Sequence, residues 1–389
     1  MAERWWKVAW PGLCATLCGI GFGRFTYTAI VPYLIGAGQV TPPGAAYLGA
    51  ATLAAYVVGA SAASSLAIRF GAATVLRLAF LLTSLSLLAC AVPAGLWWLL
   101  PWRVLIGATG ALLMILGPSV VLVRAAAGER ARVSGLALAG VGLGTGFGSL
   151  LVAALAPLGV SWAWLGLGVA SGLAGALSWS KWRGAGAARA VGSLKSGRSR
   201  PSLRSVPLLF AIAAFGIDGI GFIPHSLFWV DFLARELRLG TAVANGVFLF
   251  FALGAALGPV LSGPIGDRIG IGLALTLAFA IKTVAIALPW AVTTVPALSL
   301  SAFVVGALAP GIAALSAARI AELVAPEHQA RSWGLAVLAF SSCQAIGGYG
   351  LSYLFASLGH YQPLFLVGAA AQAVGLLCAL GTLLARPRA

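Results

Sequence analysis

The chain has 389 residues, of which 61% are hydrophobic and only 8% are charged, whereas ordinary soluble domains carry about 25% charged residues. Its formal net charge is +16 at pH 7, but a nucleic-acid-binding surface needs basic residues clustered beside a packed soluble core, and this composition leaves no such core. These values exclude nucleic acid as the expected partner and indicate an integral protein of a lipid bilayer.

Twelve apolar runs follow one another along the chain, separated by short polar or Pro/Gly-rich breaks. Each approaches the ~20 residues that a helix needs to cross a bilayer, whereas strands of a membrane barrel alternate over only ~10 residues. We therefore predict twelve transmembrane helices. They cover approximately residues 10–34, 44–68, 74–93, 97–123, 133–156, 160–179, 206–230, 242–264, 271–290, 295–318, 332–356 and 361–384.

The positive charges predict the orientation, because Lys and Arg in short loops are held on the cytoplasmic side of a membrane. With both termini inside, only two of the 24 basic residues fall in outer segments and three fall within spans. The outer ones are Arg235 and Arg238, and those within spans are Arg24, Arg103 and Lys282. We expect a multi-pass protein of the inner (cytoplasmic) membrane with both termini in the cytoplasm.

The chain divides into two halves of six spans. Residues 1–180 and 206–389 flank a basic, Gly/Ser/Ala-rich segment at 181–205, which is typical of a flexible linker. Short sequences recur between the halves at one constant offset: RFG at 69–71 returns as RIG at 268–270, and RVSGLA at 132–137 returns as RSWGLA at 331–336. The fold predicted is all-α, with two pseudo-symmetric six-helix bundles.

One loop carries the first family resemblance. The segment GPIGDRIG at residues 263–270 resembles the loop signature of the major facilitator superfamily. The resemblance implies that Asp267 and Arg268 form a conformational latch between neighbouring helices at the cytoplasmic face. The first half departs from the pattern, because Ile68 stands in the position of the acidic residue.

A narrower resemblance covers nearly the whole chain. The opening GIGFGRFTYTAIVP and the stretch DGIGFIPHSLFWVDFLAREL in the seventh span are similar to the YbfB/YjiJ-type branch of that superfamily. Arg103, followed by Gly107 and Gly110, looks like the Arg-Gly motif of the superfamily's fourth helix, which is sometimes linked to proton coupling. Membership would imply the major facilitator fold, with a substrate site near the midplane between the halves.

Arg24 is a formal positive charge in the middle of the first apolar run. A buried guanidinium costs several kcal/mol, so a membrane helix keeps one where it faces a cavity, a partner or a ligand. Tyr27 and Thr28 share its helix face, and the three side chains together would orient an anion. The alternative role is structural, with Arg24 donating hydrogen bonds to the carbonyls of a neighbouring helix.

The seventh span places Asp218 and His225 seven residues apart, with Pro224 removing a backbone donor between them. Asp218 is the only carboxylate that we place inside a span rather than at its end. We expect Asp218, together with His225, to accept a coupling proton, and a static ion pair of Asp218 with Arg24 or Arg103 is the alternative. His225 has a second possible role as a packing residue at the interface.

Two further polar residues lie within spans of the second half. Gln344 in the eleventh span shares a face with small residues and could hydrogen-bond a substrate, or equally a neighbouring helix. Lys282 in the ninth span is interpreted as a snorkelling or packing residue. The sequence contains neither a P-loop nor a nucleophile elbow, and its three histidines are far apart. We therefore expect no enzyme activity, no cofactor and no metal.

These observations favour a secondary active transporter, expected as a monomer, that moves a small organic solute by alternating access with proton coupling. The charges within the spans favour an anionic or carboxylate-bearing substrate, bound by Arg24, Tyr27, Thr28, Arg103, His225 and Gln344. Two alternatives stay open: an efflux pump for amphipathic drugs or metabolites, and a non-transporting membrane sensor or assembly factor. The absence of an appended soluble domain disfavours the sensor.

Overall fold

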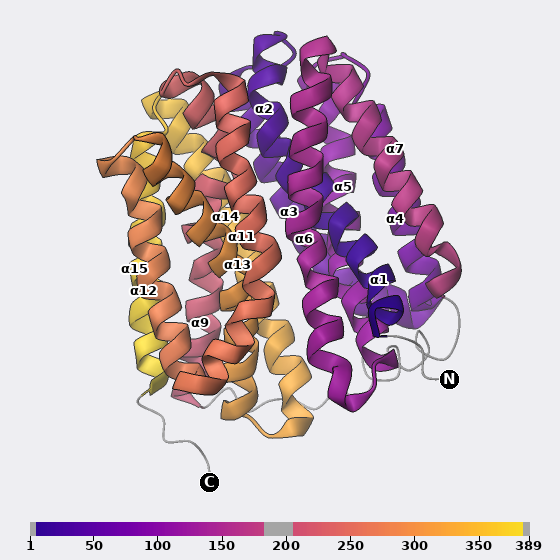
Figure 1. Cartoon of the computed structure of the whole chain (residues 1–389), viewed down its shortest axis with the longest axis vertical. Helices are drawn as coiled ribbons and strands as arrows, with labels where there is room; N and C mark the ends of the chain where they lie inside the picture. The colour runs from indigo at the N-terminus through magenta and orange to yellow at the C-terminus, as the bar shows by residue number, and fades with distance from the viewer. Residues whose placement is uncertain (1–4, 183–204, 384–389) are drawn as a thin grey trace.

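The computed structural model describes residues 5–182 and 205–383, and the regular secondary structure within these ranges is helical, with short turns and loops between the helices (Figure 1). Within these described ranges, twelve helices are long and apolar enough to cross a membrane, which confirms the predicted number of spans. Their outward faces carry exposed Leu, Val and Ile side chains, among them Leu81, Val284 and Leu377. Apolar exposure on this scale suits contact with acyl chains and not with water.

The first half contains six membrane-spanning units. The first unit is continuous but changes its helical form along its length. The elements of this half are α1 (Trp5–Thr16), the π-helical η1 (Leu17–Phe25), α2 (Thr26–Gly36), α3 (Pro42–Phe70), α4 (Ala72–Ala89), α5 (Leu96–Arg124), α6 (Arg130–Leu155) and α7 (Val160–Ser178), with short 3₁₀ turns η2 (Ala127–Glu129), η3 (Ala156–Leu158) and η4 (Trp179–Trp182).

The second half also contains six units, and its first unit is interrupted as well. The elements are α9 (Val206–Gly221), the π-helical η5 (Pro224–Phe228), α10 (Trp229–Asp231), the π-helical η6 (Phe232–Glu236), α11 (Gly240–Ile269), α12 (Ile271–Ala291), α13 (Val295–Leu323), α14 (Pro326–Leu358) and α15 (Gln362–Leu383). The seventh span therefore extends to Glu236, beyond the predicted end at residue 230.

The two halves lie side by side, with α6 packed on α11 and α3 packed on α14 along the seam between them (Figure 1). Most of the segment predicted as a linker lies outside the described residues, so the division at residues 181–205 stays a prediction. The seam is close where small residues meet: a Cβ added to Gly142 of α6 would lie 2.1 Å from the backbone nitrogen of Ala256 in α11.

Glycines explain the close packing of the π-helical segment η1. A Cβ added to Gly21 would lie 2.6 Å from the Cα of Gly144 in α6, so side chains at this crossing would collide with backbone. π-helical turns inside helices are rare and occur frequently at functional sites. This segment also carries Arg24, which it places on the side of the first span that faces the second half.

Pro224 interrupts the seventh span as its sequence predicts. α9 ends at Gly221, and the π-helical η5 begins at Pro224, whose ring removes one backbone donor from the ladder. Phe222 occupies the break, where its backbone N–H reaches the carbonyl oxygen of Asp218 at only 3.4 Å. The interruption thus separates Asp218 from His225, which a continuous helix would have stacked on one face.

Candidate functional site

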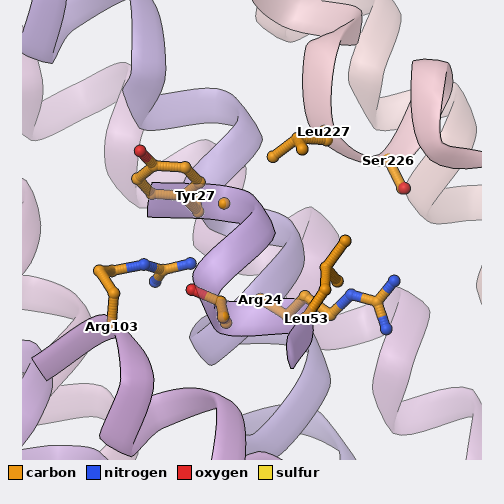
Figure 2. Close-up of a pocket in the computed structure, with 8 residues that line it drawn as sticks. Arg24, Tyr27, Leu53, Arg103, Ser226 and Leu227 are labelled. Atoms are coloured by element: carbon orange, nitrogen blue, oxygen red, sulfur yellow. The ribbon is translucent and has the colours of Figure 1, made fainter. Parts of the chain in front are cut away.

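A small pocket lies at the seam between the halves. Its first-half lining consists of Arg24, Tyr27, Gly49, Thr52, Leu53 and Arg103, and its second-half lining consists of Ser226 and Leu227 (Figure 2). The lining contains two guanidinium groups and no carboxylate. Its free space is on the order of one water molecule, so the surrounding side chains are nearly closed over it in this conformation.

Arg24 has no anionic partner in this pocket. Its guanidinium lies 5.1 Å from the ring centre of Phe25 and 5.6 Å from that of Phe222, and its Nη2 atom is buried without a hydrogen-bond partner among the described residues. In Figure 2 the side chain extends away from Arg103. The expected alternative of a carbonyl-bonded structural arginine finds no acceptor in the described part of the chain.

Arg103 is held by the first span. Its Nη1 donates to the carbonyl oxygen of Gly23 at 2.9 Å, its guanidinium lies 4.1 Å from the ring centre of Tyr27, and the residue is 1% exposed. The Tyr27 hydroxyl in turn donates to the carbonyl oxygen of Ala45 in α3 at 2.8 Å. Arg103 and Tyr27 therefore fix the shape of the wall. Each arginine keeps one buried donor without a partner among the described residues, Nε in Arg103 and Nη2 in Arg24, but Arg103 is also held by its bond to the Gly23 carbonyl.

Thr28 connects the halves beside this pocket. Its hydroxyl donates to the carbonyl oxygen of Ser226 at 2.5 Å, and the side chain is outside the pocket lining. The break that Pro224 introduces places this carbonyl in a π-helical segment, where the backbone is less regular. Thr28 thus contributes a contact between η5 and α2.

Asp218 pairs with Lys282 and not with an arginine of the first half. Lys282 Nζ lies 2.6 Å from Asp218 Oδ1, and Gln372 Nε2 donates to the same oxygen at 2.8 Å. The alternative prediction of a static ion pair between Asp218 and Arg24 or Arg103 is therefore wrong, because the cation that pairs with Asp218 is Lys282. Lys282 is also fully buried, which contradicts the snorkelling interpretation, because α12 turns this residue toward α9 and α15 instead of toward the membrane surface.

His225 lies in the second half, away from the pocket lining. Its ring stacks on Trp229 at 4.2 Å between centres, and its Nε2 lies 2.8 Å from the Ser301 hydroxyl oxygen. The Ser301 hydroxyl donates to the carbonyl oxygen of Ala285 at 2.6 Å. Since a hydroxyl has only one proton to donate, the Nε2 of His225 must carry a proton and donate to Ser301.

Gln344 is buried on α14 beside α9. A Cβ added to Gly219 would lie 3.3 Å from the Cβ of Gln344, and Gln344 Nε2 has no hydrogen-bond partner among the described residues. The residue is absent from the pocket lining. Of the expected substrate site, the structure thus brings together Arg24, Tyr27 and Arg103 in one pocket lining. The other three expected residues, Thr28, His225 and Gln344, lie outside this lining.

Comparison with known families gives a match that covers most of the chain. A family model described as "Uncharacterised MFS-type transporter YbfB" matches residues 16–380, a range that includes every residue of the pocket lining. The chain belongs to this family of MFS-type transporters. A search of curated proteins finds no match.

Family membership and the twelve apolar helices identify the protein as a multi-pass membrane transporter and not an enzyme. The all-helical structure with twelve spans is consistent with the major facilitator fold that the resemblance implied. The hypothesis of a non-transporting sensor or assembly factor is thereby disfavoured. The substrate and the coupling ion are not specified by the family.

The expected latch of this MFS-type transporter lies at the end of α11. Asp267 and Arg268 are both exposed there, just before Gly270, whose φ of 88° allows the chain to turn into α12. Neither side chain forms an ion pair with another described residue. The latch therefore stays a prediction about a contact that is not formed among the described residues.

One buried carboxylate was missed by the sequence analysis because the seventh span was predicted to end too early. Asp231 is 1% exposed, lies 2.7 Å from the Nε of Arg235, and accepts a hydrogen bond from the Tyr361 hydroxyl. Burial and the neighbouring Asp231 raise the pKa of Tyr361 above its ordinary value, so that the hydroxyl stays protonated and donates. This network ties η6 to the start of α15.

Proposed function

We propose that this MFS-type transporter is a secondary active transporter that moves a small carboxylate-bearing organic solute across the cytoplasmic membrane by alternating access, with a proton as the coupling ion. The observation that carries the proposal is Arg24, a guanidinium with a buried, unused donor at a pocket between the two halves.

The energetics favour an anion at Arg24. A charge buried in a membrane helix costs several kcal/mol, whereas a cation near an aromatic ring gains about 0.5–2 kcal/mol. The contacts with Phe25 and Phe222 therefore offset only part of the cost. A carboxylate is planar and accepts two parallel hydrogen bonds from a guanidinium, and it would supply both the missing charge and the missing acceptors.

The surroundings favour an organic over an inorganic anion. Phe25 and Phe222 lie against the guanidinium, and Tyr56 of α3 is within electrostatic reach of it. Leu53 and Leu227 line the pocket as well. An apolar or aromatic body attached to the carboxylate would bury surface against these side chains, which contributes about 25 cal/mol for each Å² removed from water.

Proton coupling is proposed for Asp218. This carboxylate is buried in the second half, and its Oδ2 atom has no hydrogen-bond partner among the described residues. A carboxylate that can be protonated within a membrane span is a typical element of proton-driven transport. His225 remains a second candidate, because its Nδ1 is also buried without a partner.

Efflux of amphipathic compounds is the second candidate function. The seam contains a chain of aromatic contacts, in which Phe25 packs edge-on against Phe222 and Phe251, and Phe251 stacks on Phe248. Aromatic surfaces of this kind also bind flat hydrophobic compounds, including organic cations. A cationic amphiphile, however, would meet Arg24 and Arg103 as repulsive charges.

Thermal stability of the purified protein distinguishes these functions. We expect benzoate, a planar aromatic carboxylate, to raise the melting temperature of the wild type but not of Arg24→Gln. Arg69→Gln, which removes an exposed arginine at the end of α3, is the matched control and should respond like the wild type. Equal stabilisation of Arg24→Gln by benzoate would remove Arg24 from the site, and stabilisation by tetraphenylphosphonium alone would favour efflux of amphipathic cations.

A further inference from the structure

Phe222 contacts two cations that come from different halves of the protein. Its ring centre is 5.6 Å from the guanidinium of Arg24 and 5.1 Å from the Nζ of Lys282. The two charges are therefore no farther apart than the sum of these distances. Arg24 belongs to the pocket, whereas Lys282 belongs to the pair with Asp218, so this one ring contacts both groups.

The hydrogen bonds of Asp218 are concentrated on one of its two oxygens. Oδ1 accepts from Lys282 Nζ and from Gln372 Nε2, whereas Oδ2 is buried with no partner among the described residues. The approach of Gln372 depends on Gly221, where an added Cβ would lie 2.1 Å from the amide oxygen of Gln372. Gln372 and Lys282 thus position the carboxylate so that Oδ2 is the atom available to a proton.

The remaining neighbours of Asp218 leave Lys282 as its main electrostatic partner. α15 contributes the neutral Gln372 and α14 the neutral Gln344, while on the same span His225 bonds Ser301 of α13. Two ion pairs among the described residues of these elements lie elsewhere: Asp231 pairs with Arg235, and Arg319 of α13 pairs with Glu322. A change in the charge of Asp218 is therefore felt first by Lys282.

We infer that Lys282 and Phe222 connect proton binding at Asp218 to carboxylate binding at Arg24, so that protonation of Asp218 strengthens the binding of an anion. The inference rests on the proposed function, because it takes Arg24 as the anion-binding residue. Lys282 acts in it as a positioning residue and does not contact the solute, whereas Phe222 contributes both its contact with Lys282 and apolar surface beside Arg24.

The sign of the coupling follows from charge. When Oδ2 accepts a proton, Asp218 becomes a neutral acid, Lys282 keeps its three protons, and the network gains one positive charge. Lys282 then lacks its counter-ion, while the face of Phe222 remains a favourable contact for its ammonium group. Over about 10 Å at an effective dielectric constant of about 20, one unit charge changes an anion's binding constant by about tenfold. Proton and anion therefore favour each other's binding, and by linkage this effect is reciprocal.

Calorimetric titration of the purified full-length protein with benzoate tests the inference. We expect the wild type to bind benzoate more tightly at about pH 5.5 than at about pH 7.5, by up to the roughly tenfold that one full unit of charge would produce. Asp218→Asn, which imitates the protonated acid, should bind at both values as tightly as the wild type does at the lower one. Glu129→Gln, which removes a carboxylate outside the spans, should keep the wild-type pH dependence.

Substitutions of Phe222 separate the coupling from general packing. Phe222→Leu should reduce the ratio of the benzoate association constant at the lower pH to that at the higher pH. Phe222→Tyr, which keeps the aromatic face, should preserve this ratio. Phe248→Leu removes a fully buried ring that contacts no cation in the described part of the chain, and it should also preserve the ratio. This control shows whether loss of any buried aromatic side chain would suffice.

The outcomes separate this inference from the proposed function. Benzoate binding that requires Arg24 but has equal affinity at both pH values and in Asp218→Asn overturns the inference and leaves the anion site intact. The same result would be obtained if Lys282 lost its proton whenever Asp218 gained one, since the net charge would then stay constant. Absence of benzoate binding in the wild type overturns the aromatic-carboxylate site, and with it this inference.

Discussion

The Asp218–Lys282 pair shows how strongly one residue's role depends on its neighbour. Both side chains are at most 1% exposed, and a buried ion left without its counter-ion is strongly destabilising, by about 3–5 kcal/mol. Lys282→Met should therefore lower the free energy of unfolding by several kcal/mol. The double variant Asp218→Asn/Lys282→Met should be less destabilised than the sum of the two single variants.

Chemical denaturation in detergent, followed by the fluorescence of the native tryptophans, measures this double-mutant cycle. Lys181→Met is the control, because this lysine is exposed and its loss should change the unfolding free energy little. Additive effects of the two single variants would mean that the pair contributes nothing beyond its separate parts.

The sequence identified Arg24 and Asp218 correctly as ionic groups inside the membrane, because a charge in a long apolar run is visible without a structure. It did not reveal that Lys282 is the partner of Asp218. That pairing depends on which face of α12 is turned toward α9. A helix whose residues are almost all apolar shows little periodic pattern in its sequence, so the sequence does not indicate which face is turned toward a neighbouring helix. Asp231 was missed for a different reason, since its span continues to Glu236.

At the scale of elements, the π-helical segment η1 depends on close backbone contact with α6. Gly21→Ala would place a Cβ 2.6 Å from the Cα of Gly144, and neither backbone can move away without disturbing its helix. We expect a loss of about 1–3 kcal/mol, the usual cost of overpacking, seen as a lower melting temperature. Anion binding should weaken too, because Arg24 is in this segment.

Gly246→Ala provides the matched control for this packing argument. Gly246 lies within α11, and an added Cβ there meets no atom within 4 Å. Alanine is favoured over glycine inside a helix by about 0.5–1 kcal/mol, so this variant should be as stable as the wild type or slightly more stable. If Gly21→Ala behaved in the same way, the close crossing of η1 and α6 would be refuted.

The apolar runs predicted all twelve spans, with ends that shifted by several residues. They did not predict the π-helical geometry of η1, η5 and η6. Glycines at alternate positions, such as Gly19, Gly21 and Gly23, indicate that another chain can approach closely, but they do not specify which helical form the backbone adopts. Pro224 gave the clearest local signal, because it removes a donor wherever it stands within a helix.

At the scale of the whole molecule, the halves touch at the end that the charge distribution predicts to face outside. Thr28 bonds the Ser226 carbonyl, Tyr47 of α3 lies against Tyr349 of α14 with ring centres 6.3 Å apart, and Gly49 packs under Leu227. Alternating access would require these contacts to separate. The repeats predicted two related halves, but the residues that meet along the seam depend on how the halves dock.

Uptake of labelled benzoate into proteoliposomes tests the central claim most directly. With the lumen more alkaline than the outside, we predict that the wild type accumulates benzoate above empty liposomes, that a protonophore abolishes the accumulation, and that Arg24→Gln reduces it to the background while Arg69→Gln does not. Empty liposomes measure the passive entry of the protonated acid. Uptake by Arg24→Gln equal to that of the wild type, or wild-type uptake no greater than that of empty liposomes, would contradict the account.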